Sequence, residues 1–373
     1  MKAKVLQVVT ALSWRGGEQQ AAYLIQELKN EVDNFVLCSA GSKMEDFCNQ
    51  SGITHFSQPK KGSIDFSYAK RLKQICDENQ IDLIHVHDAH AHTFSILAAS
   101  IFGNKTPIIL SRRVDFPIKN NLFSHFKYNH KQIKKILCVS DTIKRITATG
   151  IKDQSKLETV YSGIDLNKFK PSSGILRKEL GIAEDVFLIG NTSALADHKD
   201  YFTFIDVAER VIAKHSNCQF VVMGDGPMKD EIHQYAQSKS LKNQLTFTGF
   251  RNDIPEVLAD LDLFLITSKT EGLGTSILDA FASSVPVVGT AGGGIAELIE
   301  NEKTGLLCEV KNIEQLTIAV ERMIAEPLVR ENCTQEAKRK VQLFSKEQTA
   351  KNTLKYYLEV LSLKSFNPNK IKQ

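Results

Sequence analysis

The chain has 373 residues, of which 42% are hydrophobic and 24% are charged, and its formal net charge is +4. This composition excludes a disordered or membrane-spanning chain, and the length favours two domains over one. The basic balance is too small to argue for nucleic acid, and no base-stacking module is recognisable.

The cysteines and the start of the chain indicate the compartment. All seven cysteines stand singly, with no CxxC pair, as buried thiols do in a reducing compartment. Residues 1–10 have too short an apolar run for a signal peptide, and no run of 18 apolar residues occurs. We therefore expect a cytoplasmic protein.

Short apolar runs alternate with segments of helical period over the first half of the chain. Between the first two runs, Ala21, Leu24, Ile25 and Leu28 fall on one helical face. This alternation predicts a parallel sheet covered by helices. The runs are VLQVVT (5–10), FVLCSA (35–40), DLIHVH (82–87), PIILS (107–111) and ILCVS (136–140).

The alternation starts again after a turn-rich stretch at 160–171. We predict an α/β protein with two Rossmann-like, doubly wound domains, 1–165 and 166–346, which face a central cleft. A helix within 347–373 is expected to pack back toward the N-terminal domain, and the polar end from residue 365 is expected to be mobile. The second set of runs is VFLIG (186–190), QFVVM (219–223), LTFT (245–248), DLFLIT (262–267) and VPVVG (285–289).

A turn with two glycines, EGLGTS at 271–276, follows one of these runs and precedes a helical segment. Gly272 and Gly274 let the backbone pass close to a ligand. The amides of Gly274, Thr275 and Ser276 at a helix N-terminus suit a phosphate without a side-chain cation.

Two acids, Glu271 and Asp279, stand eight positions apart around this turn. Carboxylates beside a phosphate site could accept hydrogen bonds from sugar hydroxyls, which suggests a sugar nucleotide. A capping box formed by Ser276 and Asp279 is the other open interpretation.

Glycines also occupy three other corners between a strand and a helix, at 13–17, 224–227 and 289–294. None of them fits the G-x-G-x-x-G pattern, so a nicotinamide or flavin site lacks its fingerprint. Single glycine turns are common, but several at the strand ends of both domains favour a phosphate-binding cleft.

With these segments in view, the chain resembles the family 4 retaining glycosyltransferases of the GT-B fold over nearly its whole length. In the family motif, a glutamate is followed by seven residues and a second glutamate; Glu271 matches the first, and Asp279 stands at the second. The segments are VLQVVTALSWRGGEQQAAYLIQEL, ILCVSDTIKRITATGI, VYSGIDLNKFKP, VVMGDGP, LTFTGFRNDIPEVLADLDLFLITS and EGLGTSILDAFASSVPVVGTAGGGIAELIENEKTGLL.

The resemblance implies roles for several residues. Glu271 would hold the donor sugar, Asp279 the ribose hydroxyls, and Gly16 and Gly17 would approach the diphosphate. The donor is expected to be a UDP- or GDP-sugar, and no metal or other cofactor is implied. The remaining donor-binding residues would be Gly249, Phe250, Gly272, Leu273, Gly274, Thr275 and Ser276.

The basic residues depart in part from the family pattern. Lys199 is present to stabilise the leaving diphosphate, but Ala194 stands where an arginine is common. Arg113, at a place where many relatives have a histidine, is a candidate replacement. Arg112 or Arg113 could instead meet an acidic group of the acceptor or donor.

Two segments could suggest a metal. Asp260 and Asp262 form a D-x-D that precedes a strand, at the wrong end of the sheet, so we interpret them as helix-end and turn residues. The stretch HVHDAHAH (85–92) could form an imidazole cluster. We prefer histidines that line the cleft or contact the acceptor, chiefly His87 and His90.

The segment 112–135 interleaves basic and aromatic residues, with Leu122, Phe123 and Phe126 able to share one side of a helix. Such a segment favours an anionic membrane surface, at the inner face of the membrane. The alternative is an ordinary solvated helix with a buried apolar stripe.

The leading hypothesis is therefore a retaining glycosyltransferase for a surface glycan, lipopolysaccharide or glycolipid acceptor. By resemblance, the acceptor attacks on the face that the diphosphate leaves, and no residue stands out as a covalent nucleophile. Two alternatives stay open: a GT-B sugar-nucleotide 2-epimerase, which needs no acceptor, and a non-catalytic sugar-nucleotide-binding protein.

Overall fold

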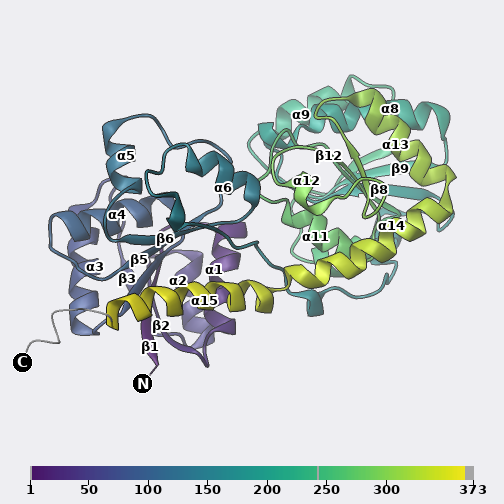
Figure 1. Cartoon of the computed structure of the whole chain (residues 1–373). Helices are drawn as coiled ribbons and strands as arrows, with labels where there is room; N and C mark the ends of the chain where they lie inside the picture. Colours follow the sequence, from purple (N-terminus) through teal and green to yellow (C-terminus); the bar gives the residue numbers. More distant parts are fainter. Residues whose placement is uncertain (1, 242, 366–373) are drawn as a thin grey trace, which may run out of the picture. The chain divides into compact units, whose positions relative to one another are not determined.

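The computed structural model describes residues 2–241 and 243–365 and divides into two compact units (Figure 1). The first unit contains the chain up to Gly163 and the last helix from Lys346, and the second contains Ile164–Ser345. Almost all of the polar end expected to be mobile, residues 366–373, lies outside the described residues.

The first unit is built on a parallel sheet of seven strands in the order β3-β2-β1-β4-β5-β6-β7. The order 3-2-1-4-5-6 is that of a Rossmann sheet, as predicted. The strands are β1 (Ala3–Val9), β2 (Val32–Ser39), β3 (His55–Gln58), β4 (Leu83–Val86), β5 (Ile108–Arg112), β6 (Ile133–Cys138) and β7 (Leu157–Thr159). The α-helices are α1 (Gly16–Glu27), α2 (Lys43–Ser51), α3 (Phe66–Glu78), α4 (Ala89–Ser100), α5 (Leu122–Tyr128), α6 (Asp141–Ala148) and α15 (Lys346–Ser365).

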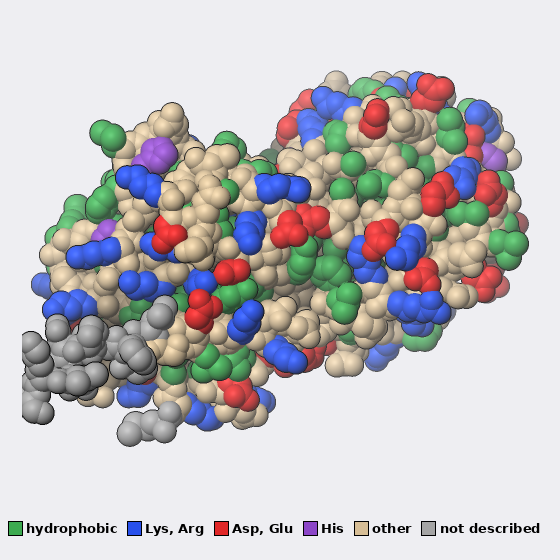
Figure 2. Space-filling model, viewed as in Figure 1, with side chains coloured by type: hydrophobic (Ala, Val, Ile, Leu, Met, Phe, Trp, Pro, Cys, Tyr) green, Lys and Arg blue, Asp and Glu red, His purple; other side chains and the backbone are tan. Residues whose placement is uncertain are grey.

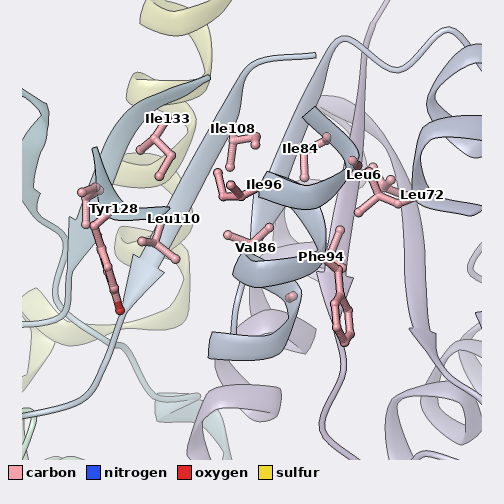
Figure 3. Packing of buried hydrophobic residues seen from close by; sticks show 14 of the residues in the cluster. Leu6, Leu72, Ile84, Val86, Phe94, Ile96, Ile108, Leu110, Tyr128 and Ile133 are labelled. Carbon is pink, nitrogen blue, oxygen red and sulfur yellow. The ribbon is translucent and has the colours of Figure 1, made fainter. Parts of the chain in front are cut away.

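One face of this sheet packs against helices α3 and α4 (Figure 3). Leu6, Ile84 and Ile108 come from three neighbouring strands and share a hydrophobic cluster with Phe94 and Ile96 of α4. All five side chains are at most 3% exposed. A parallel sheet covered by helices buries both of its faces, and its strands therefore appear in the sequence as unbroken apolar runs.

Helix α15 completes the first unit by packing on α1 and β6. Its Tyr357 is fully buried beside Leu24 and Val5. The Tyr357 hydroxyl joins His85 Nδ1 at 2.6 Å and accepts from Gln7 Nε2 at 3.2 Å. The helix is thus anchored to the central strands by both apolar and polar contacts.

The second unit contains a parallel sheet of six strands in the order β10-β9-β8-β11-β12-β13, the same winding as the first. The strands are β8 (Phe187–Asn191), β9 (Cys218–Val222), β10 (Leu245–Phe247), β11 (Leu263–Ile266), β12 (Val287–Thr290) and β13 (Leu306–Cys308). The helices are α7 (Ile175–Leu180), α8 (Tyr201–Lys214), α9 (Lys229–Gln237), α10 (Ile254–Val257), α11 (Thr275–Ala282), α12 (Ile295–Leu298), α13 (Ile313–Ala325) and α14 (Pro327–Lys340), with 3-10 turns η2 (Leu166–Lys168), η3 (Asp197–Lys199), η4 (Leu258–Asp260) and η5 (Val341–Phe344).

The two acids of the D-x-D sequence tie the start of the second unit to its sheet. Asp260 accepts hydrogen bonds from the Ser172 hydroxyl at 2.5 Å and from the backbone N–H groups of Gly174 and Leu176 at 2.9 and 2.7 Å. Asp262 forms an ion pair with Arg177 at 2.5 Å. These contacts agree with the interpretation of both acids as structural turn residues.

The anchor at Tyr357 leads to a stability prediction. Tyr357→Phe leaves His85 Nδ1 and Gln7 Nε2 without their buried hydroxyl partner, so it should lower the free energy of unfolding by about 1–3 kcal/mol in a urea titration. Tyr356→Phe is the control, because that hydroxyl bonds the partly exposed Glu158 at 3.2 Å. An equal loss in both variants would contradict this account.

Candidate functional site

The loop that follows β11 in the second unit places Glu271 against a lysine from another strand end. Glu271 Oε1 accepts from the Ser268 hydroxyl at 2.7 Å and from Lys199 Nζ at 2.6 Å, and Glu271 is only 9% exposed. Lys269 of the same loop pairs with Asp197 at 2.7 Å, which holds the two loops together a second time. The structure therefore brings together Glu271 and Lys199, which are 72 residues apart in the chain.

This pair has a free side that a ligand could use. Both donors bond Oε1, so Oε2 of Glu271 can accept a hydrogen bond from a hydroxyl. Removing either partner would leave the other charge poorly compensated in a largely buried place, which is costly. The pair is therefore a rigid feature of the loop.

Helix α11 begins at Thr275, as the sequence predicts, and Gly274 is its N-cap with φ of +93°. That backbone conformation favours glycine. The N–H groups of Gly274, Thr275 and Ser276 donate to no acceptor in the described part of the chain. They form a binding place for an anion at a helix N-terminus.

The alternative interpretation, a capping box formed by Ser276 and Asp279, is wrong. Because Gly274 is the N-cap, Ser276 lies inside the helix and no side chain caps this end. The Leu273 side chain, predicted to contact the donor, is buried at 3% exposure, so only its backbone could do so.

Asp279 lies one turn into α11 and is partly buried. Its carboxylate makes no hydrogen bond or ion pair with any residue that the structure describes. Burial raises the pKa of Asp279 to about 7, and the positive charge of Lys168 acts in the opposite direction. This carboxyl therefore changes its charge close to neutral pH.

The glycines fall into two groups according to what a Cβ atom would meet. In the run Gly292–Gly294, a Cβ would come within 2.3–2.6 Å of carbonyl oxygens in the 268–272 loop. At Gly224 and Gly226 it would come within 2.0 and 2.4 Å of the carbonyl oxygens of Ser193 and Leu195. Packing of backbone against backbone therefore requires the glycines at these two corners, and the prediction that the corners contribute to phosphate binding stays a prediction.

Gly16, Gly17 and Gly249 are different, because no atom lies within 4 Å of an added Cβ. They leave open space beside the backbone. Phe250, next to Gly249, is 73% exposed and available to a ligand. The neighbouring Arg251 is already held by Glu179 at 2.8 Å and Asp253 at 2.7 Å.

The histidines of the first unit each have their own partners, although the ring centroids of His85 and His87 lie 4.2 Å apart. His85 bonds Tyr357 and Ser111, and His92 Nε2 bonds the Lys127 carbonyl at 3.2 Å. His90 is partly exposed beside Phe94. Among the described residues, no group of three or more His, Cys, Asp or Glu side chains is arranged to hold a metal.

His87 and Arg113 form a contact at the end of β4. His87 Nε2 bonds Gln7 Oε1 at 2.8 Å, while Arg113 donates to the His87 carbonyl at 3.2 Å and lies 3.4 Å from Nδ1. Burial holds the pKa of His87 well below its usual range and lowers that of Arg113 to about 10. The histidine is therefore neutral and the arginine charged at pH 7.

A cavity of about 650 Å³ in the first unit collects four of the predicted residues, Gly17, His87, Arg112 and Arg113. His90 is not among the residues that line it. The cavity also contains Lys127, which the sequence analysis did not single out. The interleaving of basic and aromatic residues in 112–135 was the available indication.

Comparison with known proteins covers both units. Residues 14–168 match the family model "Glycosyltransferase Family 4", and residues 172–340 match "Glycosyl transferases group 1". An N-acetyl-alpha-D-glucosaminyl L-malate synthase of Bacillus anthracis is 26% identical over 80% of both chains. A UDP-Gal:alpha-D-GlcNAc-diphosphoundecaprenol alpha-1,3-galactosyltransferase of Escherichia coli is 23% identical over 86% of this chain and 88% of its own.

The fold is also found in solved structures. HepE of Anabaena, in complex with UDP and glucose, superposes with a TM-score of 0.83 over 96% of this chain and 100% of its own, at 20% identity. Structural similarity at this sequence identity shows the fold, which consists of two Rossmann-like units with the order of elements found in GT-B proteins.

The carboxyl of Asp279 leads to a prediction about pH. Its pKa is raised in the folded protein, so between about pH 4 and 7 the folded protein binds more protons than the unfolded chain, and stability falls as pH rises through this window. Asp279→Asn should therefore gain stability relative to wild type on going from pH 5 to pH 8, by about 1.4 kcal/mol for each pH unit between 5 and the raised pKa, or roughly 2–3 kcal/mol in all. Denaturant titrations at both pH values measure it.

Asp225→Asn is the control, because the backbone N–H of Gly226 and Lys229 lower the pKa of this exposed carboxyl. Its effect on the free energy of unfolding should not change between pH 5 and 8. A stability difference between Asp279→Asn and wild type that stays constant from pH 5 to pH 8 would contradict the raised pKa of Asp279.

Proposed function

The chain belongs to the GT-B glycosyltransferases of family 4, and on this premise we propose that it is a retaining enzyme that moves a sugar from a UDP- or GDP-sugar to a surface glycan, lipopolysaccharide or glycolipid acceptor. No cofactor is needed in this proposal. The contact between Lys199 and Glu271, beside the free N-terminus of α11, is the observation that carries it.

The chemistry of this place suits a departing diphosphate. The reaction breaks the bond between the anomeric carbon and the diphosphate, so negative charge develops on the leaving oxygen. Lys199 and the N–H groups at the start of α11 offer donors in fixed positions for that charge. Glu271 Oε2 would accept from a hydroxyl of the donor sugar, which fixes the sugar relative to its leaving group.

The rest of the donor would contact neighbouring residues of the second unit. Asp279 would accept from the ribose hydroxyls when it is ionised, and Phe250 with Gly249 would flank the base. In the first unit, the open space beside Gly16 and Gly17 suits close approach of a phosphate to the backbone.

Helix α5 supports a second part of the proposal, a peripheral contact with an anionic membrane. Leu122, Phe123 and Phe126 are 91%, 48% and 53% exposed, so the alternative of a buried apolar stripe is wrong. Figure 2 has the same view as Figure 1, and at the position of α5 it shows hydrophobic, basic and histidine side chains on the surface. None of the described helices is long and apolar enough to cross a membrane.

The reaction is tested by product release from nucleotide sugars. We expect the purified chain to release nucleoside diphosphate slowly from one of UDP-glucose, UDP-N-acetylglucosamine or GDP-mannose, and that donor to raise the melting temperature. Glu271→Gln and Lys199→Met should each lower the rate by about 100-fold or more, because each removes a fixed interaction with the reacting centre.

Lys269→Met is the matched control, since it removes a lysine of the same loop whose partner Asp197 is exposed. It should keep most of the rate. A melting temperature that no nucleotide sugar raises would contradict the proposal. Formation of an epimer in the absence of an acceptor would show the epimerase activity in its place.

The membrane contact is tested by flotation with vesicles that contain phosphatidylglycerol. The double variant Leu122→Ser/Phe126→Ser should lose most vesicle binding because it removes the exposed apolar groups. Leu343→Ser, an equally simple change at an exposed leucine (69%) of the second unit, should bind as wild type does. Equal binding by all three proteins would overturn this part.

A further inference from the structure

The cavity of the first unit lies where β4 and β5 end, beneath helix α5. Its wall combines cations with apolar groups such as Leu110, Phe116 and Phe123. The five cations that line it are Arg15, Arg112, Arg113, Lys119 and Lys127, and the two acids are Glu18 and Asp88. Since burial keeps the lining His87 and His92 neutral, positive charge is in excess.

The two most buried cations are held only by neutral groups. Arg112, which is 5% exposed, donates to the Tyr128 hydroxyl at 2.6 Å and to the Phe116 carbonyl, and its Nε has no acceptor. Lys127, 9% exposed, donates to the Thr93 hydroxyl at 3.2 Å and lies 3.5 Å from the Ala89 carbonyl. Within the described residues, no ion pair joins a cavity cation to an acid.

The two acids in the wall are already engaged at helix starts. Glu18 accepts from the Arg15 backbone N–H at 2.9 Å at the start of α1. Asp88 accepts from the backbone N–H and the hydroxyl of Thr10, both at 2.6 Å, and from the first N–H groups of α4. Their carboxylates therefore stabilise backbone donors and form no ion pair with the cations in the described part of the chain, although the charges of both raise the pKa of Arg113 and that of Asp88 raises the pKa of Lys127.

Such an arrangement costs free energy in the empty protein. Burial, and then the charge of Arg112, lower the pKa of Lys127 to about 8 against the opposite effect of Asp88, so the two cations disfavour each other. The unpaired Nε of Arg112 and Nδ1 of the fully buried His92 add to this cost. An anion in the cavity would offset both the repulsion between the two cations and the cost of the unpaired polar atoms. The Arg112 guanidinium suits planar or tetrahedral oxyanions.

The apolar part of the wall restricts the class of anion. A fully hydrated ion would gain nothing from Leu110, Phe116 and Phe123, whereas an anionic group joined to a hydrocarbon segment would bury that segment against them. The diphosphate of the donor is assigned above to the start of α11 in the second unit. Gly17, which is also assigned to that diphosphate, lines the cavity, but Arg112 and Lys127 have no part in that assignment, and their charge is available to another substrate.

We propose that this cavity recognises the acceptor through an anionic group, a phosphate or a carboxylate adjacent to an apolar segment, with Arg112 and Lys127 as the binding cations. This inference rests on the proposed transferase function, because it assigns the anion to the acceptor. The charge and the apolar wall specify the chemistry of the ligand, and the test separates the two sources of the anion.

Isothermal titration of the full chain with butyl phosphate, pentanoate and neutral butyl glucoside tests the proposal. We expect one or both anions to bind and the neutral compound not to bind. Lys127→Met and Arg112→Lys should each weaken anion binding by about tenfold or more, since a buried charge-assisted bond is lost or misplaced. Lys131→Met, which removes an exposed lysine three residues after α5, should have no effect.

A stability measurement separates binding from a merely structural role. Lys127→Met should leave the melting temperature of the free protein unchanged or raise it, because it relieves repulsion from Arg112 while it weakens anion binding. A Lys127 that served only the fold would lower that temperature. Stronger binding of butyl phosphate indicates a phosphate-bearing acceptor, and stronger binding of pentanoate a carboxylate.

The outcomes for this inference and for the proposed function are distinct. Anion binding that Lys127→Met and Arg112→Lys leave unchanged, or equal binding of butyl glucoside, overturns the inference even if Glu271-dependent release of nucleoside diphosphate is found. Cation-dependent anion binding with no response to any nucleotide sugar would instead keep the anion site and remove its assignment to an acceptor.

Discussion

In a parallel sheet every strand ends at the same edge, and this constraint decides where the chemistry of both units lies. In the second unit, the loops after β8 and β11 bring Lys199 and Glu271 to one place. In the first unit, the ends of β4 and β5 place His87 and Arg113 in contact. Residues far apart in sequence thus meet because strand direction leaves their loops no other edge.

The features that could be predicted are those with a local physical cause. Unbroken apolar runs indicated parallel strands, and the glycine turn before Thr275 indicated the start of α11, because burial and a positive φ leave direct marks in the sequence. The short edge strands β3, β7 and β13 were missed, since only three or four residues leave a weak pattern. The contact between Lys199 and Glu271 depends on the tertiary fold and leaves no local mark at all.

Glycine shows most clearly why the rest could not be predicted. Gly293 and Gly16 are the same letter in similar strand-to-helix corners, yet one faces the Glu271 carbonyl and the other faces open space. The distinction depends on the partner loop, which a single sequence does not reveal. The pairing of charged side chains depends on the partner loop in the same way. The second unit neutralises its loop lysines with Glu271 and Asp197, whereas Arg112 and Lys127 of the first unit have no acidic partner among the described residues. Cations without an acidic partner lower the stability of the fold, and they remain able to bind an anion.

Helix α15 belongs to the first unit although all of the second unit separates it from that unit in sequence. On the ribosome, β1 to β7 therefore emerge well before the helix that carries Tyr357, and the second unit is synthesised in between. The first unit must wait with an incomplete core until α15 has left the exit tunnel, whereas the second can fold as one continuous segment. Premature termination within the codons of α15, Lys346–Ser365, would consequently damage the part of the protein made first.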